Sequence, residues 1–135
     1  MKMGLELGQI WWDEHLKEVY VGVASKNVWA NITYYTDSEL KNYKKLNLLI
    51  EHFVQDLKPF EWNDGDNFKI RIYPKDKVGH IKVDFSLKNG MTGYLDDAAY
   101  CECSLIFDLG QIEKLCKQIL NFINLENYSV EVAAI

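Results

Sequence analysis

Three cysteines are the residues of this 135-residue chain best suited to redox or metal chemistry. Cys101 and Cys103 stand two positions apart in a segment of alternating hydrophobicity, which places both thiols on one face of a strand. Paired zinc ligands usually flank a turn instead. Cys116 lies in the apolar stripe of an expected helix, and an odd number of cysteines is atypical of a disulfide framework. We expect all three to pack as small hydrophobic side chains, with no metal bound.

The three histidines are His15, His52 and His80. No two of them have the spacing of metal ligands, either with each other or with a cysteine. A general base also needs an orienting partner and a substrate pocket, and the sequence indicates neither. We expect solvated histidines without a catalytic role.

Paired carboxylates occur at Asp13-Glu14, at Asp64 and Asp66, and at Asp96-Asp97. The segment 63–67 resembles a calcium loop but lacks its regular spacing and closing glutamate, so we expect a turn rich in Asp, Asn and Gly. The chain has no glycine-rich phosphate loop and no nucleophile elbow. The sequence thus contains no recognisable catalytic or phosphate-binding motif, and we expect no cofactor.

Two features remain candidates for binding. The segment 61–66 sets Trp62 among carboxylates in an expected exposed connection. A second group of aromatic residues includes Trp11 and Trp12, which are adjacent on a strand and therefore point to opposite faces, so one of them should lie off the core. Exposed aromatic rings beside carboxylates are typical of protein-binding surfaces. An aromatic-rich core with ordinary acidic turns explains the same residues equally well. The second group consists of Trp11, Trp12, Trp29, Tyr34 and Tyr35.

The net charge of −5 disfavours a nucleic-acid partner, because binding a phosphate backbone needs a surplus of basic residues. Lys69, Arg71, Lys82 and Tyr73 nevertheless fall on one face of the middle strands and predict a locally basic sheet face. Exposed sheet faces often carry such residues for solubility alone. We therefore expect no nucleic-acid partner.

The chain contains no apolar segment long enough to span a membrane and no secretory leader pattern. Together with unpaired cysteines, which suit a reducing compartment, this predicts a cytoplasmic protein.

Two segments have apolar residues at helical spacing. The first runs from about Asp37 to Leu57, and Thr36 with Glu39 predicts a capping box at its start. The second runs from about Leu109 to Asn124, with a capping box of Asp108 and Gln111. This strand–cap–helix arrangement occurs twice, which is explained either by an internal duplication or by two uses of a common device.

Most other segments alternate with a period of two, which is typical of strands with one buried face. We expect one α+β domain over residues 1–135, with an antiparallel β-sheet of about six to eight strands and two amphipathic helices packed on one face. The expected order is β-β-β-α-β-β-β-β-α, with turns at Asp76–Gly79 and Asn89-Gly90. The expected strands include Leu5–Trp12, Val19–Val23, Trp29–Tyr35, Phe68–Ile72, Ile81–Leu87, Cys101–Phe107 and, at the end, Tyr128–Val132.

A longer pattern runs from about Val19 to Asn124. It comprises a strand ending in Trp-Ala-Asn-Ile-Thr-Tyr-Tyr, a capped helix ending in Phe53–Leu57, an acidic connection, the strands Phe-Lys-Ile-Arg-Ile and Gly79–Phe85, and a last strand into the helix Leu115–Ile123. This pattern resembles small bacterial immunity proteins of polymorphic toxin and contact-dependent growth-inhibition systems.

The resemblance implies a cytoplasmic, non-enzymatic protein that binds and neutralises a toxin domain. If that toxin is a nuclease with a basic active surface, an acidic inhibitor gains association rate and specificity. The residues expected to contact this basic protein partner are Glu61, Trp62, Asp64, Asp66, Asp96 and Asp97.

Two other classes remain open, and the oligomeric state is not predicted. The first is a small-ligand-binding protein or enzyme, which would need a deep polar pocket between sheet and helices. The second is a subunit of a larger assembly whose aromatic residues form the oligomer interface.

Overall fold

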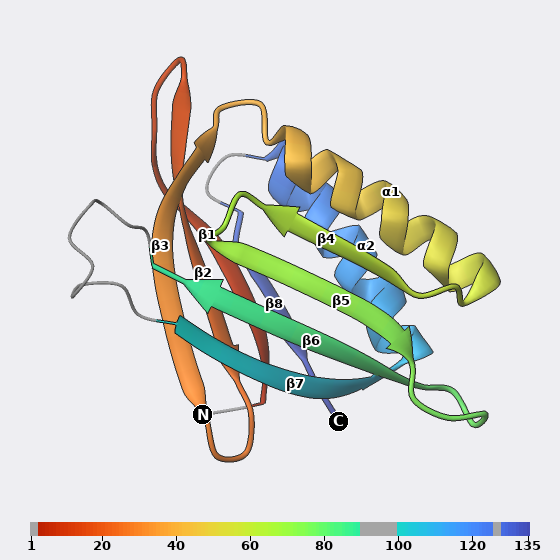
Figure 1. The fold of residues 1–135 in the computed structure, drawn as a ribbon. Coiled ribbons are helices and arrows are strands. Elements are labelled where there is room, and N and C mark those ends of the chain that lie inside the picture. Colours follow the sequence, from red (N-terminus) through yellow and green to blue (C-terminus); the bar gives the residue numbers. More distant parts are fainter. Residues whose placement is uncertain (1–2, 90–99, 126–127) are drawn as a thin grey trace.

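The computed structural model describes residues 3–89, 100–125 and 128–135. These residues form an α+β fold in the expected order β-β-β-α-β-β-β-β-α, followed by the expected final strand (Figure 1). The elements are β1 (Gly4–Trp12), β2 (Leu16–Ala24), β3 (Trp29–Asp37), α1 (Lys41–Asp56), β4 (Phe60–Asp64), β5 (Phe68–Pro74), β6 (His80–Lys88), β7 (Tyr100–Asp108), α2 (Leu109–Asn124) and β8 (Val130–Ala133).

The strands are divided between two antiparallel sheets rather than one. The first sheet has the strand order β3-β2-β1-β8 and the second has the order β4-β5-β6-β7. In Figure 1 the second sheet lies in front of the first, and its strands cross those behind it. A period of two along the sequence reports that one face of a strand is buried, but it does not report which strand lies beside it.

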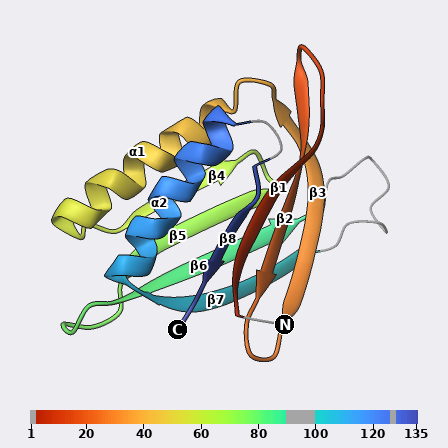
Figure 2. The same cartoon turned by 180° about the vertical axis from the view of Figure 1, so that it is seen from behind.

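The two helices lie side by side and connect the sheets. α1 packs beside β4, at one edge of the second sheet, and α2 packs beside β8, at one edge of the first (Figures 1 and 2). No helix in the described ranges is long and apolar enough to cross a membrane.

A single hydrophobic core fills the space between the two sheets and the helices. It draws on the inner faces of both sheets and on the apolar stripes of both helices. Each ring buried in this way contributes about 1.5–3 kcal/mol through removal of apolar surface from water. The fully buried rings are those of Tyr43, Phe53, Phe68, Phe85, Phe107 and Phe122.

The two halves of the chain share one topology. β1–β4 with α1, and β5–β8 with α2, each follow the order β-β-β-α-β. The last strand of each half leaves its own sheet: β4 pairs with β5, and β8 pairs with β1. Each sheet therefore consists of three strands from one half and one strand from the other.

The start of α1 differs from the prediction. Its capping residue is Leu40, with a left-handed φ of 54° and no side-chain cap, so the capping box of Thr36 and Glu39 does not form. The reason is that β3 continues to Asp37, which pairs with Leu16 of β2 and turns Thr36 toward the interior.

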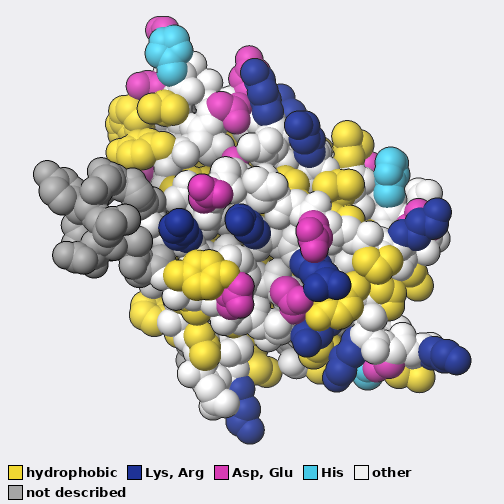
Figure 3. Space-filling model, in the orientation of Figure 1, with side chains coloured by type: hydrophobic (Ala, Val, Ile, Leu, Met, Phe, Trp, Pro, Cys, Tyr) yellow, Lys and Arg dark blue, Asp and Glu magenta, His cyan; other side chains and the backbone are white. Residues whose placement is uncertain are grey.

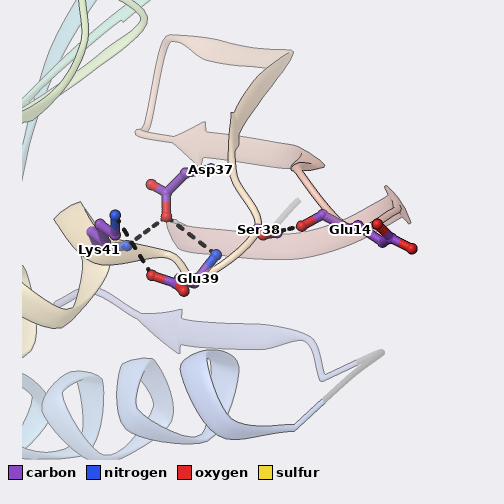
Figure 4. Close-up of polar contacts among 5 residues, drawn as sticks. All are labelled: Glu14, Asp37, Ser38, Glu39 and Lys41. Carbon is purple, nitrogen blue, oxygen red and sulfur yellow. Dashed lines mark hydrogen bonds and ion pairs between the residues drawn. The ribbon is translucent and has the colours of Figure 1, made fainter.

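Asp37 takes over the stabilisation of this connection. Its Oδ2 accepts hydrogen bonds from the backbone N–H of Glu39 at 3.1 Å and of Lys41 at 3.2 Å (Figure 4). The Ser38 hydroxyl donates to the backbone oxygen of Glu14 at 2.9 Å, which ties the connection to the β1–β2 hairpin. At α2 the expected capping box of Asp108 and Gln111 is confirmed.

Glycines at positive φ make two hairpin turns. Gly65 has a φ of 58° in the β4–β5 turn, and Gly79 has a φ of 91° in the β5–β6 turn that was expected at Asp76–Gly79. In the expected Asn89-Gly90 turn, Gly90 lies outside the described residues.

Candidate functional site

The segment expected to be an exposed acidic connection is instead strand β4 and the turn that follows it. Trp62 is 6% exposed, and its indole Nε1 donates to the backbone oxygen of Asn42 at 2.7 Å. Its ring packs edge-on against Tyr43 and Phe68. The interpretation of Trp62 as an exposed anchor for a partner is therefore wrong.

Asp64 is also buried, at 5% exposed. Its carboxylate accepts hydrogen bonds from the Tyr34 hydroxyl at 2.7 Å, the Thr36 hydroxyl at 3.2 Å and the Asn42 amide at 2.8 Å. The Tyr43 hydroxyl lies 2.5 Å from that of Tyr34 and donates to it, because the Tyr34 proton is committed to Asp64. Burial raises the pKa of both tyrosines, which remain neutral donors. Asp64 thus connects β3, α1 and β4 and is inaccessible to a partner.

Of the other four expected contact residues, the structure describes Glu61 and Asp66. Glu61 and Asp66 are exposed at one edge of the second sheet, where Glu61 lies 3.9 Å from Arg71. Asp96 and Asp97 lie outside the described residues. In the described part of the chain, the expected set is therefore not gathered into one acidic surface.

The outer face of the second sheet carries interleaved charges rather than a basic field. Cross-strand pairing places Arg71 between Glu61 and Asp84. In Figure 3, Lys and Arg side chains alternate with Asp and Glu over this face. The shallow groove there, about 910 Å³ in volume, contains Lys69, Arg71 and Lys82 but also four carboxylates. The prediction of a locally basic face was wrong because it counted basic residues without their cross-strand neighbours.

On this same face, the side chain of Tyr73 is in contact with two cationic side chains and a carboxylate. The Arg71 guanidinium stands 4.9 Å above the Tyr73 ring, and Lys82 is 5.9 Å from it. The Tyr73 hydroxyl donates to Asp84 at 3.1 Å. A tyrosine hydrogen-bonded to a carboxylate is thus covered by the arginine two positions before it on the same strand.

One histidine has a partner that the sequence did not indicate. His80 Nδ1 lies 2.7 Å from Asp76 Oδ2, and Asp76 Oδ1 accepts from the backbone N–H of Val78 and His80. The hydrogen bond from His80 is the main cause that lowers the pKa of Asp76. These contacts close the β5–β6 turn at the surface, and the spacing of four residues is the signal that could have found them. His15 and His52 are exposed.

The three cysteines are free and partly buried. Burial raises the pKa of Cys103 to about 11 and that of Cys116 to about 11. Both pack against the hydrophobic core, as expected. Within the described ranges, no group of three or more His, Cys, Asp or Glu residues is placed to hold a metal ion.

The region between the sheets and the helices is occupied by the aliphatic and aromatic side chains of the core. In the part of the chain that the structure describes, every buried side-chain nitrogen and oxygen has a hydrogen-bond partner. A hollow of about 250 Å³ lies instead at one end of the first sheet, where its lining includes Gly4, Ala24 and Trp29.

A β-bulge determines which of the two adjacent tryptophans is exposed. Gln9 pairs with Val19 and Trp11 with Glu18, so that Ile10 is the extra residue. The bulge reverses the alternation set by Leu5 and Leu7, because a one-residue shift turns the following side chains to the opposite face. Trp11 consequently lies on the outer face and is 47% exposed.

Tyr35 of β3 stands on the other side of Glu18 on this outer face. It is 59% exposed, and its ring centroid lies 6.3 Å from that of Trp11 at an interplanar angle of 86°. The neighbouring carboxylate of Glu18 raises the pKa of Tyr35. We call this end of the sheet the hairpin patch, which consists of the half-buried Glu18 and of the exposed residues Ile10, Trp11, Leu16 and Tyr35.

Between the two sheets, as far as their residues are described, the surplus of carboxylates is larger in the sheet that carries the hairpin patch. The segments 3–37 and 128–135, which build the first sheet, contain six carboxylates and two lysines. The segments 60–88 and 100–108, which build the second sheet, contain seven carboxylates and six Lys or Arg residues. The nearest acidic neighbours of the patch along the chain are Asp13, Glu14 and Asp37.

Comparison with models of known protein families, with curated proteins and with solved structures finds no match for this chain.

Proposed function

We propose that this chain is a non-enzymatic interaction protein of the cytoplasm, in the class of immunity proteins, that binds and neutralises a basic toxin domain. The observation that supports it best is the hairpin patch, where two exposed aromatic rings flank a carboxylate on the acid-rich sheet. Interface hot spots are enriched in tryptophan and tyrosine surrounded by polar residues.

Electrostatics favours the first sheet over the second as the binding face. A surface with a surplus of carboxylates accelerates encounter with a basic protein, whereas interleaved charges cancel at a distance. We therefore place the proposed binding site on the outer face of β1, β2 and β3. The β4 segment expected from the sequence is unsuitable, because Trp62 and Asp64 are buried.

The experiment is a binding measurement with a defined partner. The proposed partner is the C-terminal domain of a large secreted protein encoded immediately upstream, produced as an inactive variant if it is toxic. We expect a stoichiometric complex, and we expect Trp11→Ala and Tyr35→Ala each to weaken it about tenfold or more.

Trp29→Ala is the matched control, since Trp29 is an exposed aromatic residue at the opposite end of the same sheet. The absence of such a partner gene, or of a complex with its product, would reject the immunity function. A complex indifferent to both patch variants would reject this binding face.

A further inference from the structure

We infer that the hairpin patch is a receptor for an arginine side chain of a basic protein partner. The guanidinium stacks on the exposed rings of Trp11 and Tyr35 and pairs with the carboxylate of Glu18. This inference deepens the proposed function and rests on it, because it names the chemical group that the partner presents.

The arrangement of the patch supports a planar cation. Trp11 and Tyr35 meet edge to face, so that the two rings offer differently oriented surfaces on either side of Glu18. Aromatic faces attract cations within about 6 Å of the ring centroid. A guanidinium stacks better than an ammonium and also donates two parallel hydrogen bonds to a carboxylate.

The second sheet contains a tyrosine beside a carboxylate whose ring is already covered by a cation. There the Tyr73 hydroxyl donates to Asp84 while Arg71 covers the ring at 4.9 Å. At the patch, cross-strand pairing sets the carboxylate of Glu18 beside Tyr35. In the described part of the chain, the cations over aromatic rings are Arg71 and Lys82, and both cover Tyr73. The patch is therefore a tyrosine–carboxylate unit open to an external cation.

Charge complementarity favours a basic protein as the partner that binds the hairpin patch. A second copy of this chain would bring the same surplus of carboxylates against the patch, and a nucleic acid would bring phosphates. Both would be repelled, whereas a basic protein would be attracted.

The test is a titration of the folded, isotope-labelled protein with a hexa-arginine peptide, followed by nuclear magnetic resonance. We expect saturable shifts of the Trp11 indole and Tyr35 amide signals that weaken as salt is raised, because exposed charge pairs are screened. A hexa-citrulline peptide, which has nearly the same shape without the charge, should produce no such shifts.

Two matched variants decide the role of Glu18. Glu18→Gln should weaken peptide binding about fivefold or more, while Glu6→Gln, which removes an exposed carboxylate farther along the same face, should have much less effect. Shifts centred on Trp29, or equal effects of the two variants, would overturn the inference.

The outcomes separate this inference from the proposed function. If the peptide shifts the resonances of the patch but no toxin partner is found, the arginine receptor is supported and the immunity function is rejected. If a tight toxin complex forms but the peptide does not shift the resonances of the patch, the immunity function is supported and the arginine receptor is rejected.

Discussion

Asp64 of β4 accepts a 2.7 Å hydrogen bond from the hydroxyl of Tyr34 in β3, which joins the two sheets through a buried carboxylate. Two further donors, from Thr36 and Asn42, complete its coordination. A buried carboxylate is tolerated only when its hydrogen-bonding capacity is filled, so these residues depend on one another.

We therefore expect Asp64→Ala to lower the free energy of unfolding by about 3 kcal/mol, because it leaves the buried donors Tyr34 and Thr36 and the partly buried Asn42 without an acceptor. The nearby Asp66→Ala removes an exposed carboxylate from the same hairpin and should change stability by less than about 0.5 kcal/mol. Urea unfolding of both variants measures the difference. Equal stabilities would contradict the role assigned to Asp64.

Asp37 provides a second, smaller test at the start of α1. Replacement by alanine removes the acceptor for the backbone N–H groups of Glu39 and Lys41 and should cost about 1 kcal/mol, as for other capping side chains. Thr36→Val is the informative comparison, since the capping box predicted from sequence would give Thr36 that role. The structure predicts that Thr36→Val acts through its hydrogen bond to Asp64 and leaves the start of α1 intact. Amide exchange of the first turn of α1 distinguishes the two.

Sequence patterns predicted the structure correctly where the contacts that determine it join residues close together in the chain. The alternation in β6 and the capping box of α2 involve neighbours within four residues, and both were predicted correctly. The inward position of Trp62 was also within reach, because Phe60, Trp62 and Asp64 alternate with exposed residues in a five-residue strand. The pattern was missed because Asp64, a charged residue, occupies the last inward position of the strand. What stabilises it there is a hydrogen bond from Tyr34, which lies 30 positions upstream.

The hairpin patch depends on a feature that alternation does not encode. The residues Leu5 and Leu7 set a phase that would bury Trp11, and only the bulge at Ile10 turns it outward. The division of the strands into two sheets is likewise non-local, because it depends on pairings such as β1 with β8 between the two ends of the chain.

The raised thiol pKa values predict slow alkylation. With pKa values of about 11, Cys103 and Cys116 carry little thiolate at pH 8, so iodoacetamide should react slowly and about tenfold faster per pH unit until the pKa is approached. Because the pKa of each thiol in the folded protein lies above its ordinary value of 9.0, the protonated thiols contribute stability below about pH 9, and that contribution is lost as the pH rises toward 11. Site-resolved mass spectrometry measures the rates. Rapid labelling of the folded protein at pH 8, equal to that in denaturant, would contradict the prediction.

The exchange of strands between the two halves predicts how the chain tolerates cutting and rejoining. The pairing of β8 with β1, in which Gly4 faces Ala133, is the counterpart of the β4–β5 hairpin, in which Asp64 faces Phe68. The backbone N–H of Ala134 also donates to Met3 at 3.0 Å, which holds the two ends of the chain together. A permuted chain that joins residue 135 to residue 1 through a short glycine linker and begins at residue 66 should therefore fold with the native far-ultraviolet spectrum. The separate fragments 1–65 and 66–135 should each lack cooperative unfolding, because each lacks the strand that completes its sheet, and the two should regain it when mixed. Cooperative unfolding of either fragment alone would show that the exchanged strand is dispensable.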